Sequence, residues 1–128
     1  IAPEMEKMIR AQKRFLGKVN DTRKYAVLLY LSDVQKADAR GFGALEHPTS
    51  TTVVMPEMLP NVQMMESLKD VVSHEFFHIV TPLNIHSEEI GNFDYINPKM
   101  SKHLWLYEGV TEYFAKSILE EPKFFMEL

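Results

Sequence analysis

The segment from about Leu68 to Val80 constrains the fold more than any other, because it reads as a helix with an apolar body. That body is supplied by Val71, Val72, Phe76 and Ile79. A helix of this kind must be buried among other elements. Ser67, followed three residues later by Asp70, resembles a capping box at its start. Pro82 disfavours helical backbone at the residue before it, so we expect the helix to end near Val80.

The composition is that of a single soluble globular domain: 128 residues, 45% hydrophobic and 25% charged, with a formal net charge of −4. No apolar stretch approaches the ~20 residues that span a bilayer, so we expect no membrane segment. The absence of cysteine excludes disulfides, thiolate zinc sites and a cysteine nucleophile. The compartment stays open, because any signal peptide would lie upstream of Ile1.

Positive charge is concentrated at the start of the chain, where residues 1–24 carry seven Lys and Arg against three Asp and Glu. Apolar residues recur near helical spacing from Met5 to Val19, which predicts an amphipathic helix. Its first turn is expected at Pro3 and its exit at Gly17. The cations then form the solvated face of that helix, and we expect no nucleic-acid partner.

Strands are predicted in the first half of the chain. Tyr25–Leu31 is a continuous apolar run, which is typical of a strand buried on both faces. Ala44–Glu46 and Thr49–Met55 also look like strand material, with Pro48 between them. Because proline cannot donate a ladder hydrogen bond, we expect an edge strand there rather than a central one.

A second long helix is predicted from about Lys102 to Leu119, after a connecting loop of roughly twenty residues. Gly109 stands in the middle of this helix, where glycine costs ~1 kcal/mol relative to alanine. We therefore expect a close approach between Gly109 and the helix at residues 68–80.

His74, Glu75 and His78 form the pattern H-E-x-x-H within the first of these two helices. Positions four apart project from one helix face, so both imidazoles can reach a single Zn²⁺ ion. Glu75 points to the side of that ion, which suits a general base for the attacking water. Without a metal, two histidines and a glutamate on a largely buried helix would be costly.

The third ligand is expected from the second helix, because a catalytic zinc site usually has three protein ligands and one open position. Glu108 and Glu112 are four residues apart and therefore neighbours on one helix face. We predict Glu108 as the ligand and Glu112 as a carboxylate that accepts the free N–H of His74. An exposed helix glutamate is an equally good interpretation of Glu112.

Taken together, these motifs resemble the catalytic region of the glycyl aminopeptidase family, PDZ-containing zinc metallopeptidases of the gluzincin group. The gap between His78 and Glu108, residues 79–107, is also similar to this family. Two positions differ: Ala44 replaces a glycine, and Glu112 stands where the family often has a small polar residue. The matching segments run along the chain: Gly43–His47, where the family has Gly-Gly-Leu-Glu-His, then Val72–His78, Phe93–Tyr95, Leu104–Trp105 and Glu108–Thr111.

The resemblance implies an α+β, thermolysin-like fold, with a small mixed sheet whose edge strand lies beside the H-E-x-x-H helix. It implies an aminopeptidase that uses one Zn²⁺ ion to remove small N-terminal residues from peptide substrates. Ala44, Leu45 and Glu46 would border the substrate cleft, since an edge strand can pair with an extended peptide. Glu46 resembles the acidic residue that binds the free α-amine in related aminopeptidases. A solvent-exposed glutamate at the strand end is the alternative.

The resemblance also implies a larger protein. We expect residues 1–128 to be part of the catalytic domain, flanked by an N-terminal β domain and a C-terminal PDZ domain. Gluzincins usually add an oxyanion donor, often a Tyr or His far downstream of the third ligand. The sequence offers no candidate, so this piece alone is expected to be weakly active or inactive. An endopeptidase, or a zinc-binding domain that is incomplete or not a peptidase, stays open, as does the oligomeric state.

Overall fold

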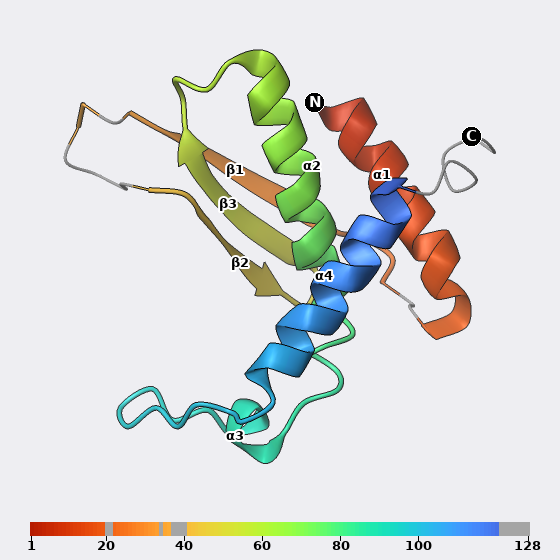
Figure 1. The fold of residues 1–128 in the computed structure, drawn as a ribbon, viewed down its shortest axis with the longest axis vertical. Coiled ribbons are helices and arrows are strands. Elements are labelled where there is room, and N and C mark those ends of the chain that lie inside the picture. Colours follow the sequence, from red (N-terminus) through yellow and green to blue (C-terminus); the bar gives the residue numbers. More distant parts are fainter. Residues whose placement is uncertain (20–21, 34, 37–40, 121–128) are drawn as a thin grey trace.

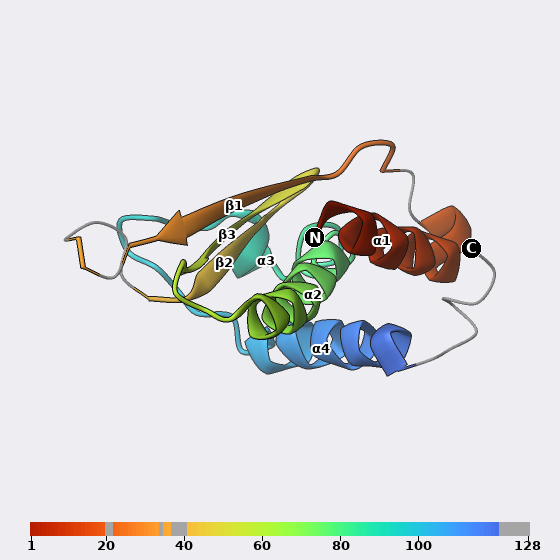
Figure 2. The same cartoon turned by 90° about the horizontal axis from the view of Figure 1, so that it is seen from above.

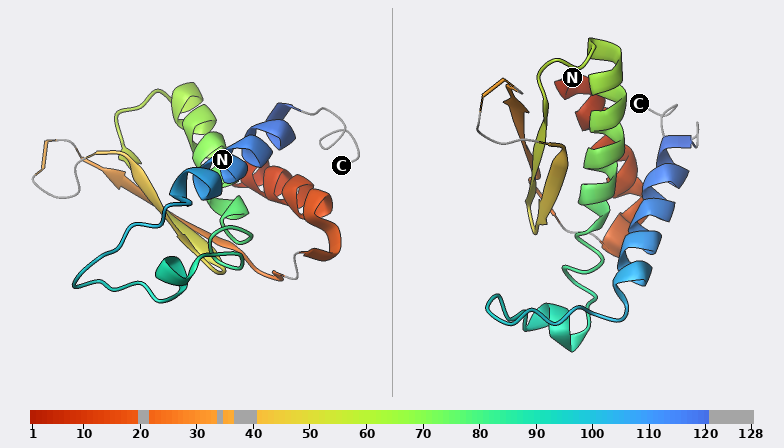
Figure 3. Two further views of the ribbon diagram at one scale, coloured as in Figure 1. Left: turned by 60° about the horizontal axis from the view of Figure 1, so that its bottom comes forward. Right: turned by 60° about the vertical axis from the view of Figure 1, so that its left-hand side comes forward.

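The computed structural model describes residues 1–19, 22–33, 35–36 and 41–120. A three-stranded sheet covers one side of the long helix α2, and α1 and α4 cover the other (Figure 1, Figure 3). The α+β class and the small mixed sheet expected from the sequence are confirmed. In chain order the elements are α1 (Ala2–Leu16), the 3-10 turn η1 (Gly17–Val19), β1 (Ala26–Ser32), β2 (Gly43–His47), β3 (Ser50–Pro56), α2 (Asn61–Phe77), α3 (Glu88–Gly91) and α4 (Leu104–Glu120).

The sheet has the strand order β1-β3-β2, with β1 parallel and β2 antiparallel to β3. Successive side chains alternate between its faces. Val27 and Leu29 therefore pack on the core, whereas Leu28 and Tyr30 are exposed. The expectation that this strand is buried on both faces is wrong, because the described helices cover only one face of the sheet (Figure 2).

Pro48 does not place the strand that follows it at an edge. It lies in the two-residue turn between β2 and β3, outside the hydrogen-bonded register of either strand. The ladder therefore loses no donor, and β3 occupies the centre of the sheet. The edge assignment is wrong for Thr49–Met55 and right for the strand that contains Ala44–Glu46.

Helix α2 begins earlier than predicted, at Asn61 instead of Leu68. Pro60 is its N-cap, and the Pro60 carbonyl accepts the first helical hydrogen bond from the Met64 N–H at 2.8 Å. The predicted capping box is wrong, since Ser67 lies inside the helix. The fixed φ of proline suits a helix start and needs no side-chain cap.

The other end of α2 also differs from the prediction. The helix stops at Phe77, and His78 is its C-cap with φ −61° and ψ −17°, still close to helical values. The expected loop between the two long helices contains a short helix, α3. Helix α4 starts at Leu104 and ends at Glu120, within two residues of its predicted bounds.

The core lies on both sides of α2. One cluster fills the space between the sheet, α1 and α2, and a smaller one joins α1, α2 and α4. Gly109 is not a point of close approach, because a Cβ at this position would meet no atom within 4 Å. The buried members of the first cluster are Met5, Met8, Val53, Met55, Met64, Leu68 and Val72, and those of the second are Ala11, Phe77, Ala115 and Ile118.

Candidate active site

The two histidines of the H-E-x-x-H motif lie at the C-terminal end of α2. His74 belongs to the last turn and His78 is the C-cap residue. Because the backbone stays near helical through His78, the two imidazoles remain on one face. Their ring centroids are 4.7 Å apart and the planes cross at 82°. Both rings turn toward the first half of α4.

Glu108 reaches these rings from α4. Its Oε2 atom lies 3.1 Å from His74 Nε2 and 3.7 Å from His78 Nε2. One ligand atom from each of the three residues lies within 4.8 Å of the other two. Ligand atoms bonded to a tetrahedral zinc at ~2.0–2.1 Å are ~3.3 Å apart. The observed separations bracket that value, so the three side chains fit one ion.

The second nitrogen of each imidazole is held by the protein. His74 Nδ1 lies 3.0 Å from Glu112 Oε2, and His78 Nδ1 lies 2.8 Å from the Thr81 carbonyl oxygen. The Thr81 carbonyl oxygen can only accept, so His78 Nδ1 donates and His78 Nε2 keeps its lone pair. His74 has a carboxylate oxygen beside each ring nitrogen, Glu112 Oε2 at Nδ1 and Glu108 Oε2 at Nε2. With Nδ1 of each ring held by the protein, both Nε2 atoms face Glu108 Oε2, which is the orientation that metal-binding histidines adopt.

Glu75 is buried among these groups. It is 8% exposed, and its Oε2 atom has no hydrogen-bond partner within the described structure. Burial raises the pKa of Glu75 to about 7, with smaller increases from the nearby Glu46 and Glu108 carboxylates and a decrease from His78. A carboxyl group with a pKa near neutrality and a free oxygen can take up and release protons.

Strand β2 brings Glu46 to the same place. Its carboxylate, that of Glu75 and the His78 imidazole lie within 4.8 Å of one another. Ala44, two residues earlier, faces the same way and is half-buried. Leu45 points to the opposite, outer face and is 57% exposed. Of the three residues predicted to border the cleft, only Glu46 and Ala44 turn their side chains toward α2.

Two further groups at the site were not singled out from the sequence. Thr81 acts through its backbone carbonyl, for which a sequence gives no signal beyond its position three residues after His78. The Tyr25 hydroxyl is buried without a hydrogen-bond partner, and burial together with Glu75 and Glu46 raises its pKa. Its ring packs edge-on against Phe76 at 5.0 Å. The alternation of β1 places Tyr25 on the side of Val27.

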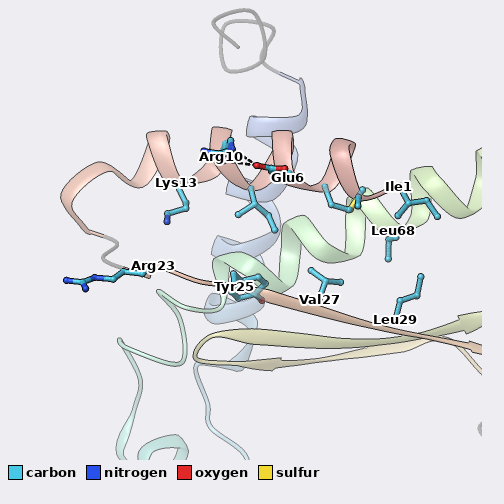
Figure 4. A pocket seen from close by; sticks show the side chains of 12 residues that line it. Ile1, Glu6, Arg10, Lys13, Arg23, Tyr25, Val27, Leu29 and Leu68 are labelled. Atoms are coloured by element: carbon cyan, nitrogen blue, oxygen red, sulfur yellow. Dashed lines mark hydrogen bonds and ion pairs between the residues drawn. The ribbon is translucent and has the colours of Figure 1, made fainter.

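Two other histidines and a larger hollow lie apart from the potential metal ligands. His86 Nδ1 is 2.8 Å from the Pro82 carbonyl oxygen, and neither His86 nor His103 joins a potential metal-binding group among the described residues. A cavity of about 620 Å³ opens between α1 and β1, and of the residues described above at the site only Tyr25 lines it (Figure 4). Within the described residues, no helix has the length and apolarity needed to cross a membrane.

Comparison with known proteins adds one match. The sequence model described as M61 glycyl aminopeptidase matches residues 67–127, a segment that contains His74, Glu75, His78, Glu108 and Glu112. The match confirms the resemblance found in the sequence and supports a peptidase. No curated protein and no solved structure matches the chain.

Proposed function

Because residues 67–127 match the M61 glycyl aminopeptidase family, we propose that this chain carries the zinc centre of a metallopeptidase that cleaves peptides next to a free N-terminus. The observation that carries the proposal is the convergence of three ligand atoms from His74, His78 and Glu108 within 4.8 Å. The fixed Nδ1 hydrogen bonds of both imidazoles support it. The arrangement of β2, α2 and α4 is what a thermolysin-like catalytic core would require.

In this proposal His74, His78 and Glu108 hold one Zn²⁺ ion, and Glu112 keeps His74 in the required tautomer. Zinc supplies Lewis acidity at the scissile carbonyl and lowers the pKa of the attacking water. Glu75 accepts a proton from that water and delivers it to the leaving amine. Its burial supports this role, since a carboxylate that water solvates less is a stronger base.

Glu46 is proposed to bind the free α-amine of the substrate. Its carboxylate lies beside Glu75 and His78, so an amine held there would place the first peptide bond at the cluster. A charge-assisted hydrogen bond of this kind typically contributes ~1.5–3 kcal/mol, or roughly 10–100-fold in the rate with limiting substrate. The free edge of β2 supports main-chain pairing with an extended peptide.

The test compares free peptides with their N-acetylated forms on the zinc-loaded full-length protein, because residues 1–128 alone are expected to be weakly active or inactive. We expect acetylation to lower kcat/KM by ~100-fold, and Glu46→Gln to remove most of that difference while zinc content stays unchanged. Equal cleavage of both forms by the native protein would overturn amine recognition and favour an endopeptidase. Absence of cleavage with zinc fully bound would overturn the peptidase proposal itself.

A further inference from the structure

A small open cavity adjoins the proposed zinc centre. It has a volume of about 280 Å³ and lies between the start of β2, the C-terminal half of α2 and the middle of α4. It shares Ala44, His74, Glu75 and Glu112 with the site described above, so whatever enters it is in contact with the proposed reaction centre. Its lining consists of Phe42, Ala44, Asp70, Val71, His74, Glu75, Glu112 and Lys116.

The position of the cavity along β2 tells which part of a peptide it would face. Phe42, Ala44 and Glu46 alternate onto one side of the chain, and the cavity is lined by the first two but not by Glu46. Glu75 lies between Glu46 and the cavity, since its carboxylate is close to that of Glu46 and it also lines the cavity. With the free amine at Glu46, an extended substrate that passes Glu75 continues toward Phe42. The cavity therefore lies on the side of the leaving group.

The chemistry of the lining favours an apolar side chain. Phe42 is 54% exposed, and it forms with Ala44 and Val71 the apolar part of the wall. Three of the charged residues are paired with one another, because Lys116 Nζ lies 3.2 Å from Asp70 Oδ1 and 3.9 Å from Glu112 Oε1, and a further one, Glu75, is the proposed general base. A charged ligand group would have to disrupt these pairs, whereas an apolar group would cover Phe42.

We propose that this cavity binds the side chain of the second residue of the substrate, immediately after the scissile bond, and selects medium-sized apolar side chains there. The inference rests on the proposed peptidase function and adds a specificity that no other observation assigns. Phe42 is the specificity-determining residue, because it carries the largest apolar surface that a ligand would cover.

The experiment measures kcat/KM of the zinc-loaded full-length protein on four tripeptides that begin and end with glycine and carry leucine, alanine, aspartate or lysine in the middle. We expect leucine to exceed alanine by at least tenfold, since each methylene in an apolar pocket is worth roughly 10-fold or more. Phe42→Ala should lower the leucine-to-alanine ratio below about threefold. Leu28→Ala, an equally exposed residue on the outer face of β1, is the matched control and should leave the ratio unchanged.

The outcomes separate the inference from the function on which it rests. Cleavage of all four peptides with similar kcat/KM, or a ratio unaffected by Phe42→Ala, would overturn the subsite and leave the peptidase proposal intact. A preference for lysine would show that Asp70 and Glu112 select the residue, and would also overturn the inference. Absence of any cleavage by the zinc-loaded protein would overturn both.

Discussion

The two hollows on either side of α2 differ in size and in chemistry. The larger hollow is not the one that lies beside the potential metal ligands. The cavity between α1 and β1 measures about 620 Å³ and is lined mainly by apolar side chains with an Arg10–Glu6 ion pair at its rim (Figure 4). The cavity beside the H-E-x-x-H motif measures about 280 Å³. Size alone would favour the larger as a binding site. Convergent ligand atoms favour the smaller.

The polar groups of the two hollows explain the difference. At the larger one, Arg10 and Glu6 are both more than half exposed and pair with each other at 2.6 Å, so they need no ligand. Tyr25 also lines this hollow, and its buried hydroxyl, which has no hydrogen-bond partner among the described residues, is near enough to Glu75 and Glu46 for their charges to raise its pKa. At the smaller one, Glu75 is buried and its Oε2 atom has no hydrogen-bond partner among the described residues, while His74 Nε2 and His78 Nε2 both face Glu108 Oε2. Buried groups without partners cost stability. Their persistence in one place indicates a function there.

The largest expected effect is that of Glu75→Gln. Removing a general base typically costs 10²–10⁴ in rate, so we expect kcat/KM on a free peptide to fall by about 10³. The amide has nearly the same shape as the carboxylate, and zinc content and the circular dichroism spectrum should not change. A variant that retained more than a tenth of native activity would exclude Glu75 as the base.

Glu112→Gln should weaken zinc binding without changing the fold. An amide can still contact His74 Nδ1 but no longer accepts as an anion, and such changes behind a ligand typically cost 10–100-fold in metal affinity. Competition with a chromogenic chelator measures this effect. Glu66→Gln, an exposed glutamate on α2, serves as the control and should leave the affinity unchanged. An equal loss in both variants would refute a specific role for Glu112.

Burial of Glu75 should also appear in the pH dependence of stability. Its pKa is raised from 4.5 to about 7 in the folded chain, so folding is penalised when the group is ionised. In the metal-free protein we expect Glu75→Gln to have a free energy of unfolding higher than native by on the order of 1–2 kcal/mol at pH 8. The difference should shrink as the pH falls through 7 and vanish near 4.5.

Urea unfolding at a series of pH values measures that difference, with Glu66→Gln as a matched variant that should show no pH-dependent gain. A constant difference between pH 5 and pH 8 would contradict the raised pKa.

The smallest effect is expected at the larger cavity. Arg23 lies at its rim and is exposed. Arg23→Ala should change the free energy of unfolding by no more than ~0.5 kcal/mol, as for most surface substitutions, and should leave kcat/KM within twofold. A tenfold loss of activity would show that the larger hollow takes part in the reaction, and the contrast between the two hollows would fail.

The parts of the fold that sequence reasoning found are those set by local periodicity. The spacing of apolar residues predicted that α2 and α4 exist, although the end of α2 inferred from Pro82 was wrong, and the four-residue spacing in each helix predicted which side chains share a face. The structure brings Glu108 and Glu112 to the two nitrogens of His74. Their catalytic roles remain proposals.

Other features depended on tertiary context that local patterns do not contain. The central position of β3 follows from a parallel pairing with β1, which joins distant segments. Ser67 and Asp70 resemble a capping box, so the prediction began α2 at Leu68 and missed its N-cap at Pro60. The Thr81 carbonyl reaches the site because the chain after α2 directs it at His78 Nδ1, and the Tyr25 ring is positioned by its packing against Phe76. In each case the residue type is compatible with several environments, and contacts with residues distant in the sequence decide which environment it occupies.

The central claim is that His74, His78 and Glu108 hold one metal ion, and zinc stoichiometry tests it most directly. The native full chain and the variants His74→Ala and Glu108→Ala are reconstituted with zinc at neutral pH, dialysed against metal-free buffer and analysed by elemental mass spectrometry. We expect about one zinc per chain in the native protein and a small fraction of that in both variants, with circular dichroism showing that all three are folded. A native protein without zinc, or variants that retain a full equivalent, would contradict the account.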